Sequence, residues 1–314
     1  MKLTLEAERW IKREVENVKA IPTATMEEIK ATDLTVIQKI STNKGTFYYK
    51  DSGTIAKFEG KLAHHLHSFY SDKSVEVTAF HPAKPWLLMK ELQGQPLREV
   101  KDKKVWKQAL QEYAELQVNE TKHVEQLIQL GVPDRRLPIL KREIQSNLNE
   151  MCQTGLSHEK TVTIMNIQEE LLEMCDKIEG IVPCSLDHGD LHSGNIQLVE
   201  GKPIFFDWGD AAVTHPFFST RVFWNVLHEW AQYDSEWLTI INEFRPSYLE
   251  PWTKFAPMKE LEEILKISDQ LACVYRGLGW LLYINRYRAN IEESEQRPAQ
   301  WLEVLLEHRE LVNS

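Results

Sequence analysis

Eight residues near the middle of the chain, His188–Asn195, constrain its fold more than any other segment. Their sequence is HGDLHSGN, and the tripeptide DWG at 207–209 follows after a short hairpin-like stretch. A tight loop that contains glycine can hold an Asp carboxylate and an Asn amide oxygen close together, and a hairpin can return a second carboxylate to the same point. Divalent ions such as Mg²⁺ prefer these oxygen ligands. The segment therefore predicts a phosphoryl-transfer site formed by Asp190, Asn195 and Asp207.

The offsets between these residues also occur in the protein-kinase signature H-R-D-L-x-x-x-N followed by D-F-G. With HGDLHSGN and DWG in those places, the chain resembles the aminoglycoside phosphotransferase and choline kinase branch of the protein-kinase-like fold. The resemblance is strongest from His188 to Pro216 and can be followed over most of the chain. It implies an α+β protein with two lobes. A small nucleotide-binding lobe with an antiparallel sheet would occupy residues 1–93, and a large, mainly helical lobe would occupy residues 94–314.

Each residue of the motif has an expected role. Asp190 would accept or orient the hydroxyl of the acceptor, because a loose phosphoryl-transfer transition state depends mostly on alignment and charge neutralisation. Asn195 and Asp207 would bind Mg²⁺. His188 would pack and hydrogen-bond inside the loop, and His192 stands where protein kinases carry a lysine that contacts phosphate.

Two alternatives apply to the same residues. An Asp beside Gly is common as a helix cap or in an Asx turn, so Asp190 alone would not indicate catalysis. A zinc site made of His188, His192 and His215 is the second alternative, but the glycines of the loop oppose a helix that would set two histidines on one face.

The first ninety residues supply candidates for nucleotide binding. Lys50 ends a β-rich run and Glu59 begins a helical one, and the resemblance assigns them to the lysine–glutamate pair that holds the α- and β-phosphates of ATP. The segment 85–94 resembles the last strand of this lobe and the interlobe hinge. By that resemblance the Lys90 carbonyl and the Leu92 amide would meet the adenine edge, with Met89 lining the base pocket.

The phosphate-covering loop departs from the family pattern. We expect it at residues 29–33, where the chain has no glycine, although glycine lets backbone amides approach phosphates closely. Gly45 and Gly53 are better explained as turn residues.

Periodicity predicts the remaining elements. Strands are expected at 34–40, 46–50, 75–80 and 86–89, and helices at 6–18, 58–70, 135–148, 161–178, 217–230, 258–287 and 297–311. A further helix is predicted by an apolar stripe of four residues, Trp106, Leu110, Tyr113 and Leu116.

Composition narrows the functional classes. The chain has 314 residues and a formal net charge of -10, which argues against a nucleic-acid partner because phosphate backbones attract basic surfaces. No apolar run approaches the roughly 20 residues that a membrane span requires. The four cysteines show no metal-binding spacing and follow no secretory signal, so we expect a cytoplasmic protein.

Together these features predict an enzyme that moves the γ-phosphate of ATP, with Mg²⁺, to a hydroxyl of a small molecule. An aminoglycoside, an amino alcohol, a sugar or another metabolite would each satisfy the chemistry. Aromatic residues of the helical lobe are available to line the acceptor pocket, although each is more often a core residue: Trp224, Trp230, Tyr233 and Tyr275. His215 follows Asp207 by only eight positions, which leaves no long activation segment and makes a protein kinase the weaker alternative. A catalytically silent nucleotide-binding module is the other alternative, because the phosphate loop is atypical.

Overall fold

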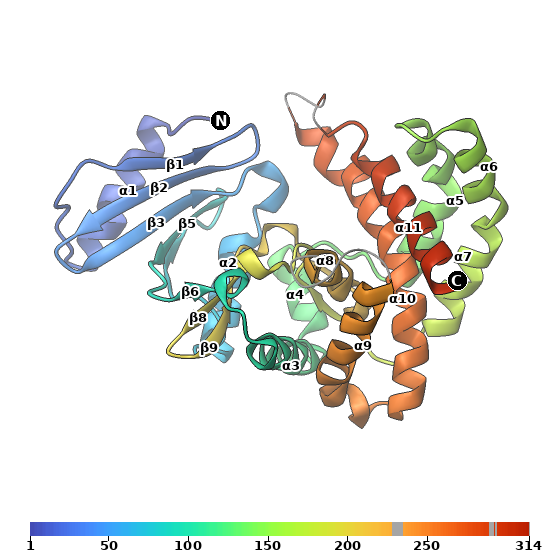
Figure 1. Ribbon diagram of the computed structural model, residues 1–314. Helices are drawn as coiled ribbons and strands as arrows, with labels where there is room; N and C mark the ends of the chain where they lie inside the picture. The colour runs from blue at the N-terminus through green and yellow to red at the C-terminus, as the bar shows by residue number, and fades with distance from the viewer. Residues whose placement is uncertain (228–234, 289–291, 293, 314) are drawn as a thin grey trace.

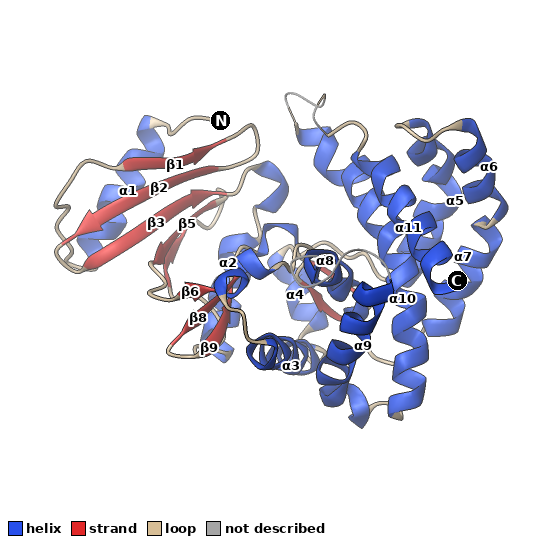
Figure 2. Cartoon of the chain, viewed as in Figure 1, coloured by secondary structure: helices blue, strands red, loops and turns tan. Residues whose placement is uncertain are grey.

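The structure is a computed structural model of the chain and describes residues 1–227, 235–288, 292 and 294–313. Two lobes lie side by side, with the N-terminus in one and the C-terminus in the other (Figure 1). The long strands gather in the N-terminal lobe, whereas helices fill most of the C-terminal lobe (Figure 2). This arrangement confirms the predicted α+β class.

The N-terminal lobe is built on a five-stranded antiparallel sheet in the order β1-β2-β3-β5-β4. Its strands are β1 (Glu27–Ala31), β2 (Val36–Thr42), β3 (Gly45–Asp51), β4 (Val77–Phe80) and β5 (Trp86–Lys90). Helix α1 (Leu5–Asn17) lies against the sheet and packs Trp10 near Tyr49 and Trp86, with ring centroids 6.1 and 5.9 Å away. The four strands predicted from the sequence are therefore all present.

The hairpin between β2 and β3 forms as expected. Thr42 pairs with Gly45, which adopts a φ of +102° that glycine tolerates and other residues rarely do. The segment 29–33, by contrast, is not the loop we expected. Strand β1 runs to Ala31, and only a tight turn of residues 32–35 connects it to β2. The Thr32 hydroxyl accepts the Leu34 and Thr35 amides, so a side chain organises this turn without glycine.

Helix α2 (Glu59–Phe69) packs next to β4 and β5. Gly60 permits the close approach, because a Cβ at this position would lie 2.8 Å from the Cβ of Phe80. Packing at Gly60 fixes the first turn of α2, and this turn presents Glu59 to strand β3.

Two small sheets follow in the C-terminal lobe. After β5 the chain forms β6 (Gln95–Pro96), which pairs with β8 (Ile196–Val199), and β8 pairs in turn with β9 (Lys202–Phe205). Strand β7 (Ser185–Asp187) pairs with β10 (Ala212–Thr214). The segment between β7 and β10 therefore begins and ends at neighbouring points.

Helices make up most of the C-terminal lobe. They are α3 (Lys103–Glu120), α4 (Val124–Leu130), α5 (Leu137–Gln153), α6 (His158–Asn166), α7 (Gln168–Ile178), α8 (Thr220–Val226), α9 (Ser235–Leu249), α10 (Met258–Gly279) and α11 (Arg297–Asn313). The short helical turns are η1 (Thr54–Ala56), η2 (Leu97–Glu99), η3 (Ser193–Asn195), η4 (Trp208–Asp210), η5 (Pro216–Ser219), η7 (Glu250–Lys254), η8 (Trp280–Ile284) and η9 (Asn285–Tyr287).

Three helix predictions differ from the structure. The helix expected at 161–178 is two helices, because Ile167 leaves the helical conformation between α6 and α7. The helix expected at 258–287 is a regular α-helix only as far as Gly279, where η8 begins. The helix expected at 217–230 begins as the short turn η5, and residues 228–230 lie outside the described part of the chain.

Helix α9 was not predicted at all. Pro246 stands inside it, and an internal proline normally indicates the end of a helix. Its side chains at spacings of three and four nevertheless form a buried face, made by Trp237, Ile241, Phe244 and Tyr248. The predicted stripe of α3 is confirmed, since its four side chains are buried in the large core. Within the described residues, no helix has both the length and the apolar character needed to cross a bilayer.

Candidate active site

The HGDLHSGN segment is a loop that starts directly after β7. Gly189 adopts a φ of +76°, and a Cβ there would lie 2.0 Å from the carbonyl oxygen of Asp210. Only glycine fits this contact, which packs the loop against the turn η4. The Asp190 amide donates to Nδ1 of His188 at 3.3 Å, so the loop also holds itself from within.

Asn195 is hydrogen-bonded to Asp190, the predicted catalytic residue, and to the residue that precedes Asp207, the other predicted metal ligand. Its side-chain Nδ2 donates to the Asp190 carbonyl at 3.0 Å, which orients the amide group. Its own carbonyl accepts the Phe206 amide at 3.2 Å, because the β8–β9 hairpin sets Ile196 opposite Phe205. Asp207 is the next residue along the chain. The hairpin therefore returns Asp207 to the loop, as the sequence predicts.

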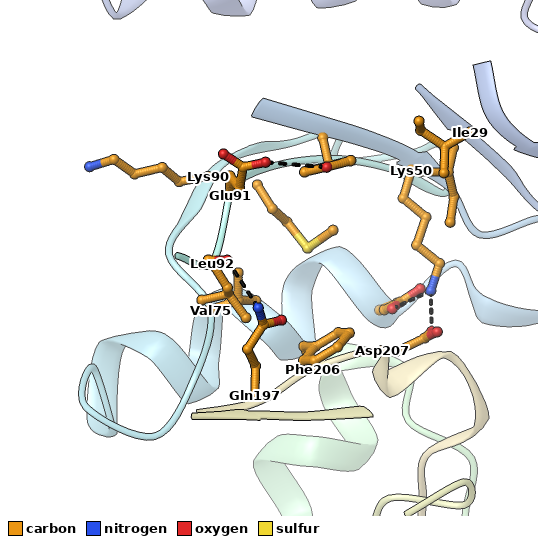
Figure 3. Close-up of a pocket in the computed structure, with 13 residues that line it drawn as sticks. Ile29, Lys50, Val75, Lys90, Glu91, Leu92, Gln197, Phe206 and Asp207 are labelled. Atoms are coloured by element: carbon orange, nitrogen blue, oxygen red, sulfur yellow. Dashed lines mark hydrogen bonds and ion pairs between the residues drawn. The ribbon is translucent and has the colours of Figure 1, made fainter. Parts of the chain in front are cut away.

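Asp207 also meets the N-terminal lobe. The Nζ atom of Lys50 lies 2.5 Å from Oδ1 of Asp207 and 2.7 Å from Oε1 of Glu59, as the dashed lines in Figure 3 show. The Ser52 hydroxyl donates to the second oxygen of Glu59 and fixes that carboxylate. Asp207 has a φ of +65°, a left-handed conformation that Asp tolerates better than most residues. This conformation occurs at the point where the strand turns into η4.

The charges of this cluster reinforce one another. Burial alone would lower the pKa of the Lys50 ammonium, but the carboxylates of Asp207 and Glu59 outweigh burial and raise that pKa. The ammonium in turn lowers the pKa of Asp207. Lys50 is therefore cationic and Asp207 anionic at neutral pH, although 46% of the Asp207 side chain stays accessible to solvent.

A cavity of about 390 Å³ opens above this cluster (Figure 3). Two polar side chains of its lining are held by hydrogen bonds. The Tyr48 hydroxyl donates to Glu91 at 3.3 Å. Nε2 of Gln197 donates to the carbonyls of Leu92 and Gly94 at 3.2 and 2.9 Å. Gln197 lies on β8, so it ties the second lobe to the connection between the lobes. The cavity is lined by Ile29, Ile37, Tyr48, Lys50, Glu59, Val75, Met89, Lys90, Glu91, Leu92, Gln197, Phe206 and Asp207. Every residue predicted to bind nucleotide is in this lining.

The two histidines of the motif occupy different environments. His188 is fully buried, and burial lowers the pKa of its imidazole, so the ring is neutral. Its Nε2 lies 3.0 Å from the Phe206 carbonyl, which fixes the loop to the hairpin. His192 accepts the Gly194 amide on Nδ1 at 2.9 Å and places Nε2 3.5 Å from Oδ2 of Asp190. His192 therefore lies beside Asp190 and is not part of the lining of the first cavity.

A second cavity, of about 260 Å³, lies against η4. Arg276 lines it and brings Nη2 to 3.7 Å from Oδ1 of Asp190. Asp210 is exposed overall, but the surrounding protein atoms desolvate its carboxyl group and raise the pKa of that group to about 6. The Arg276 guanidinium lowers this pKa, and the Asp190 carboxylate raises it further. The lining consists of Thr54, Ile55, Phe58, Pro133, Arg135, Gly209, Asp210, Ala211, Ala212, Arg276, Gly279, Tyr283, Ile284 and Tyr287.

Sequence reasoning named other aromatic residues for such a cavity. Trp224 and Tyr275 are instead buried in the core, where Trp224 donates to Asp269 and Tyr275 to Asp187. Trp230 and Tyr233, named for the same role, lie outside the described residues. Residues 280–287 supply aromatic rings because the chain leaves regular helix at Gly279, and the sequence pattern had suggested an uninterrupted helix there.

Asp187 is a buried residue of the site that the sequence analysis missed. Its carboxylate accepts the Gly189 amide at 3.0 Å, the Ser219 hydroxyl at 2.5 Å and the Tyr275 hydroxyl at 3.1 Å. Three donors satisfy this buried carboxylate and hold the start of the loop. No local signal distinguishes it, since its partners Ser219 and Tyr275 come from segments far along the chain.

The alternative zinc site has no geometric support. Nδ1 of His215 accepts the Phe217 amide at 3.3 Å, and burial lowers the pKa of His215 to about 3. Across the part of the chain that the structure describes, His188, His192 and His215 do not form a group of potential metal ligands.

Comparison with known proteins agrees with this architecture. Among solved structures, a GDP complex of a mutant aminoglycoside 2'-phosphotransferase-IIIa shares 14% identity with a TM-score of 0.64, over 96% of this chain and 97% of that one. A choline/ethanolamine kinase family protein from Mesorhizobium loti shares 14% identity with a TM-score of 0.59, over 98% and 99% of the two chains. An ethanolamine kinase from Plasmodium vivax shares 15% identity with a TM-score of 0.57, over 89% and 81%. These similarities show a kinase-like fold.

A search of curated protein sequences found no match. The family model described as "Phosphotransferase enzyme family" matches residues 57–251, which is well over half of the chain and includes Glu59 and the whole HGDLHSGN-to-DWG segment. The chain therefore belongs to the phosphotransferase enzyme family.

Proposed function

We propose that this protein transfers the γ-phosphate of ATP to a hydroxyl group of a small molecule. The nucleotide would bind between a lobe of residues 1–93 and a lobe of residues 94–314. Pairing of β6 with β8 supports a boundary at this point, because residues 95–96 already belong to a sheet of the second lobe. A cytoplasmic location would supply the ATP and Mg²⁺ that the reaction needs.

The first cavity is the proposed nucleotide site. Ile37, Met89 and Phe206 offer apolar surface for a planar base, and the backbone of Lys90 and Leu92 would meet its polar edge. Lys50 lies at the other end of the cavity, where Glu59 and Asp207 hold its ammonium. An ammonium in this position can pair with the α- and β-phosphates.

Asn195 and Asp207 would hold Mg²⁺, and their chemistry fits this ion. One offers an amide oxygen and the other a carboxylate, both hard oxygen ligands, and the hairpin register keeps the two residues together. The Asn195 amide nitrogen is already engaged by the Asp190 carbonyl, so the amide oxygen is the atom left to face a cation. Bound Mg²⁺ would neutralise charge on the phosphate oxygens as transfer proceeds.

Asp190 would align the acceptor hydroxyl and take its proton. Contacts connect Asp190 to the linings of both cavities. Its backbone carbonyl accepts the Asn195 side chain, and the Asn195 carbonyl accepts the amide of Phe206, which lines the first cavity. Its Oδ1 approaches Arg276, which lines the second. That position is the single observation that carries the proposal. The second cavity would accordingly hold the acceptor, and its volume of about 260 Å³ suits a small molecule.

A screen of hydroxyl-bearing compounds with ATP and Mg²⁺, followed by ADP release, tests the proposal. Wild type and Asp190→Asn should be assayed in parallel, and mass spectrometry should show a phosphorylated product with the wild type alone. GTP in place of ATP defines the preferred donor. Nucleotide binding without transfer to any acceptor would favour a silent binding module, and phosphate transfer only to protein would favour a protein kinase; either result contradicts the proposal.

A further inference from the structure

Away from both cavities, three potential metal ligands meet between the lobes. They are His65 on α2, Glu120 at the end of α3, and His123 just before α4. Nε2 of His65 lies 3.0 Å from Oε2 of Glu120, and Nδ1 of His123 lies 3.0 Å from Oε1 of the same carboxylate. One ligand atom from each residue lies within 4.8 Å of the other two, and no other group of three has this geometry in the described part of the chain.

The surroundings of this cluster resemble the second layer of a metal site. The Tyr70 hydroxyl donates to Oε1 of Glu120 at 2.7 Å and orients the carboxylate. The Phe69 ring lies 4.8 Å from the His65 ring and 4.7 Å from the His123 ring, so it covers both imidazoles on one side. His65 and Glu120 are buried, whereas 24% of the His123 side chain is exposed, which leaves a route for an ion to enter.

The donor set selects a class of ion. Two imidazole nitrogens and one carboxylate suit Zn²⁺ and related first-row dications, whereas Mg²⁺ and Ca²⁺ prefer oxygen ligands alone. Zinc binds nitrogen and carboxylate oxygen at about 2.0–2.2 Å, so tetrahedral neighbours lie about 3.3 Å apart. The two nitrogen–oxygen separations of 3.0 Å are a few tenths of an ångström shorter than this value. In the metal-bound state the imidazole nitrogen that faces Glu120 would carry no proton, and the ion would replace the two hydrogen bonds.

We propose that His65, Glu120 and His123 form a binding site for Zn²⁺ or a similar transition-metal dication. The ion would join α2, which carries Glu59, to the α3–α4 junction of the other lobe. Binding at this point would stabilise the position of α2 and so of the Glu59–Lys50 pair. The site stands on its own geometry and does not depend on the phosphotransfer proposed above.

Metal binding by the full chain tests this inference. Protein treated with a chelator should be titrated with Zn²⁺ against a competing colorimetric chelator, and with Co²⁺ by visible absorption. We expect one tight Zn²⁺ per chain and the absorption of a low-coordinate Co²⁺ site. His65→Gln and His123→Gln should each abolish both signals, and Tyr70→Phe should weaken Zn²⁺ affinity by about 10–100-fold, as loss of an orienting partner does elsewhere.

His64→Gln is the matched control, because His64 lies one residue away on the same helix but is exposed. This variant should bind Zn²⁺ as the wild type does, and Zn²⁺ should raise the Tm of both proteins. Since His65 is buried and its substitution can destabilise the fold, the part-exposed His123 provides the second test. Equal Zn²⁺ affinity of the wild type and a well-folded His123→Gln protein would overturn the proposal, as would no Zn²⁺ binding by the wild type.

Discussion

The two cavities share one wall, the turn from Asp207 to Asp210, but they present different side chains. The first is lined mainly by aliphatic and aromatic residues, and the ammonium of Lys50 is neutralised there by two carboxylates. The second presents the guanidinium groups of Arg135 and Arg276 beside several aromatic rings. Arg135 binds Glu143 at 3.2 Å, whereas the ion pair of Arg276 with Asp190 is looser, at 3.7 Å.

This difference separates what the two cavities can recognise. Apolar walls with one preorganised cation suit a planar base attached to a polyphosphate. A wall with an incompletely paired guanidinium suits an acceptor that carries polar or negatively charged groups. Variants on either side of the shared turn should therefore change binding of one substrate and leave binding of the other nearly unchanged.

The largest effect is expected at Asp190, whose carboxylate lies 3.7 Å from Arg276 of the second cavity. Asp190→Asn keeps the size of the side chain but removes its ability to take a proton. We expect kcat to fall by about 10²–10⁴-fold, the usual contribution of a general base. Nucleotide affinity should stay nearly constant, because Asp190 is not part of the lining of the first cavity. Steady-state kinetics with an acceptor from the screen, together with calorimetric titration of Mg·ATP, measures both quantities.

Unchanged turnover in Asp190→Asn would remove Asp190 from the mechanism. A loss of nucleotide affinity as large as the loss of kcat would show that the two cavities are not separable through this residue. Glu99→Gln, a carboxylate change elsewhere on the second lobe, is a matched control for removal of one negative charge and should behave as the wild type.

The first cavity could largely be predicted from the sequence, and the second could not. Asp190, Asn195 and Asp207 lie within 18 positions of one another on a loop and a hairpin, whose geometry follows from local rules. The family resemblance assigned Lys50 and Glu59, because a strand signal and a helix signal place the two residues where the family carries its pair. The lining of the second cavity comes from segments near 54, 134, 210 and 280, and only tertiary packing brings these together.

Local chemistry also explains the errors in the predicted fold. The Thr32 hydroxyl stabilises the turn of residues 32–35 without glycine. The positions of glycine therefore do not indicate where the chain turns here. Helix α9 tolerates Pro246 because its buried face, with Trp237 and Tyr248, is stabilised by the core. The His65, Glu120 and His123 cluster joins two lobes, so sequence spacing could indicate only its Glu120–His123 part.

A change in the first cavity should produce the second-largest effect. Lys50→Met keeps much of the apolar stem but removes the charge that pairs with Glu59 and Asp207. Charge-assisted hydrogen bonds contribute about 1.5–3 kcal/mol, so Mg·ATP affinity should fall by about 10–100-fold. The KM of the acceptor should change little. Lys84→Met, in the same lobe but outside the lining of this cavity, is the matched control, because its ammonium pairs instead with Glu6 on the surface. Equal losses in the two variants would contradict a phosphate-binding role for Lys50.

A change in the second cavity should give the opposite pattern. Arg276→Gln should raise the KM of the acceptor by about tenfold, as expected when one charged hydrogen bond to a ligand is lost, while Mg·ATP affinity stays constant. Arg276→Lys keeps the charge and should recover part of the loss. Kinetics with each substrate varied in turn gives both values. If the KM of the acceptor is unchanged while the Tm falls, Arg276 has a structural role only, and the second cavity loses its assignment as acceptor site.

The smallest effect is expected at Gln197, a lining residue of the first cavity that also ties the lobes together. Gln197→Ala removes two hydrogen bonds, to the carbonyls of Leu92 and Gly94. Each contributes about 0.5–1.5 kcal/mol, but water can replace part of them at this half-exposed position, so we expect a loss of stability of about 1 kcal/mol in urea unfolding. Gln108→Ala, on an exposed face of α3, is the control for loss of an amide side chain. Because Gln197 lines the first cavity and not the second, Mg·ATP affinity should fall a few-fold and the KM of the acceptor should not change. An equal rise in both constants would mean that the link sets the relative position of the lobes, and that the two cavities respond to it as one.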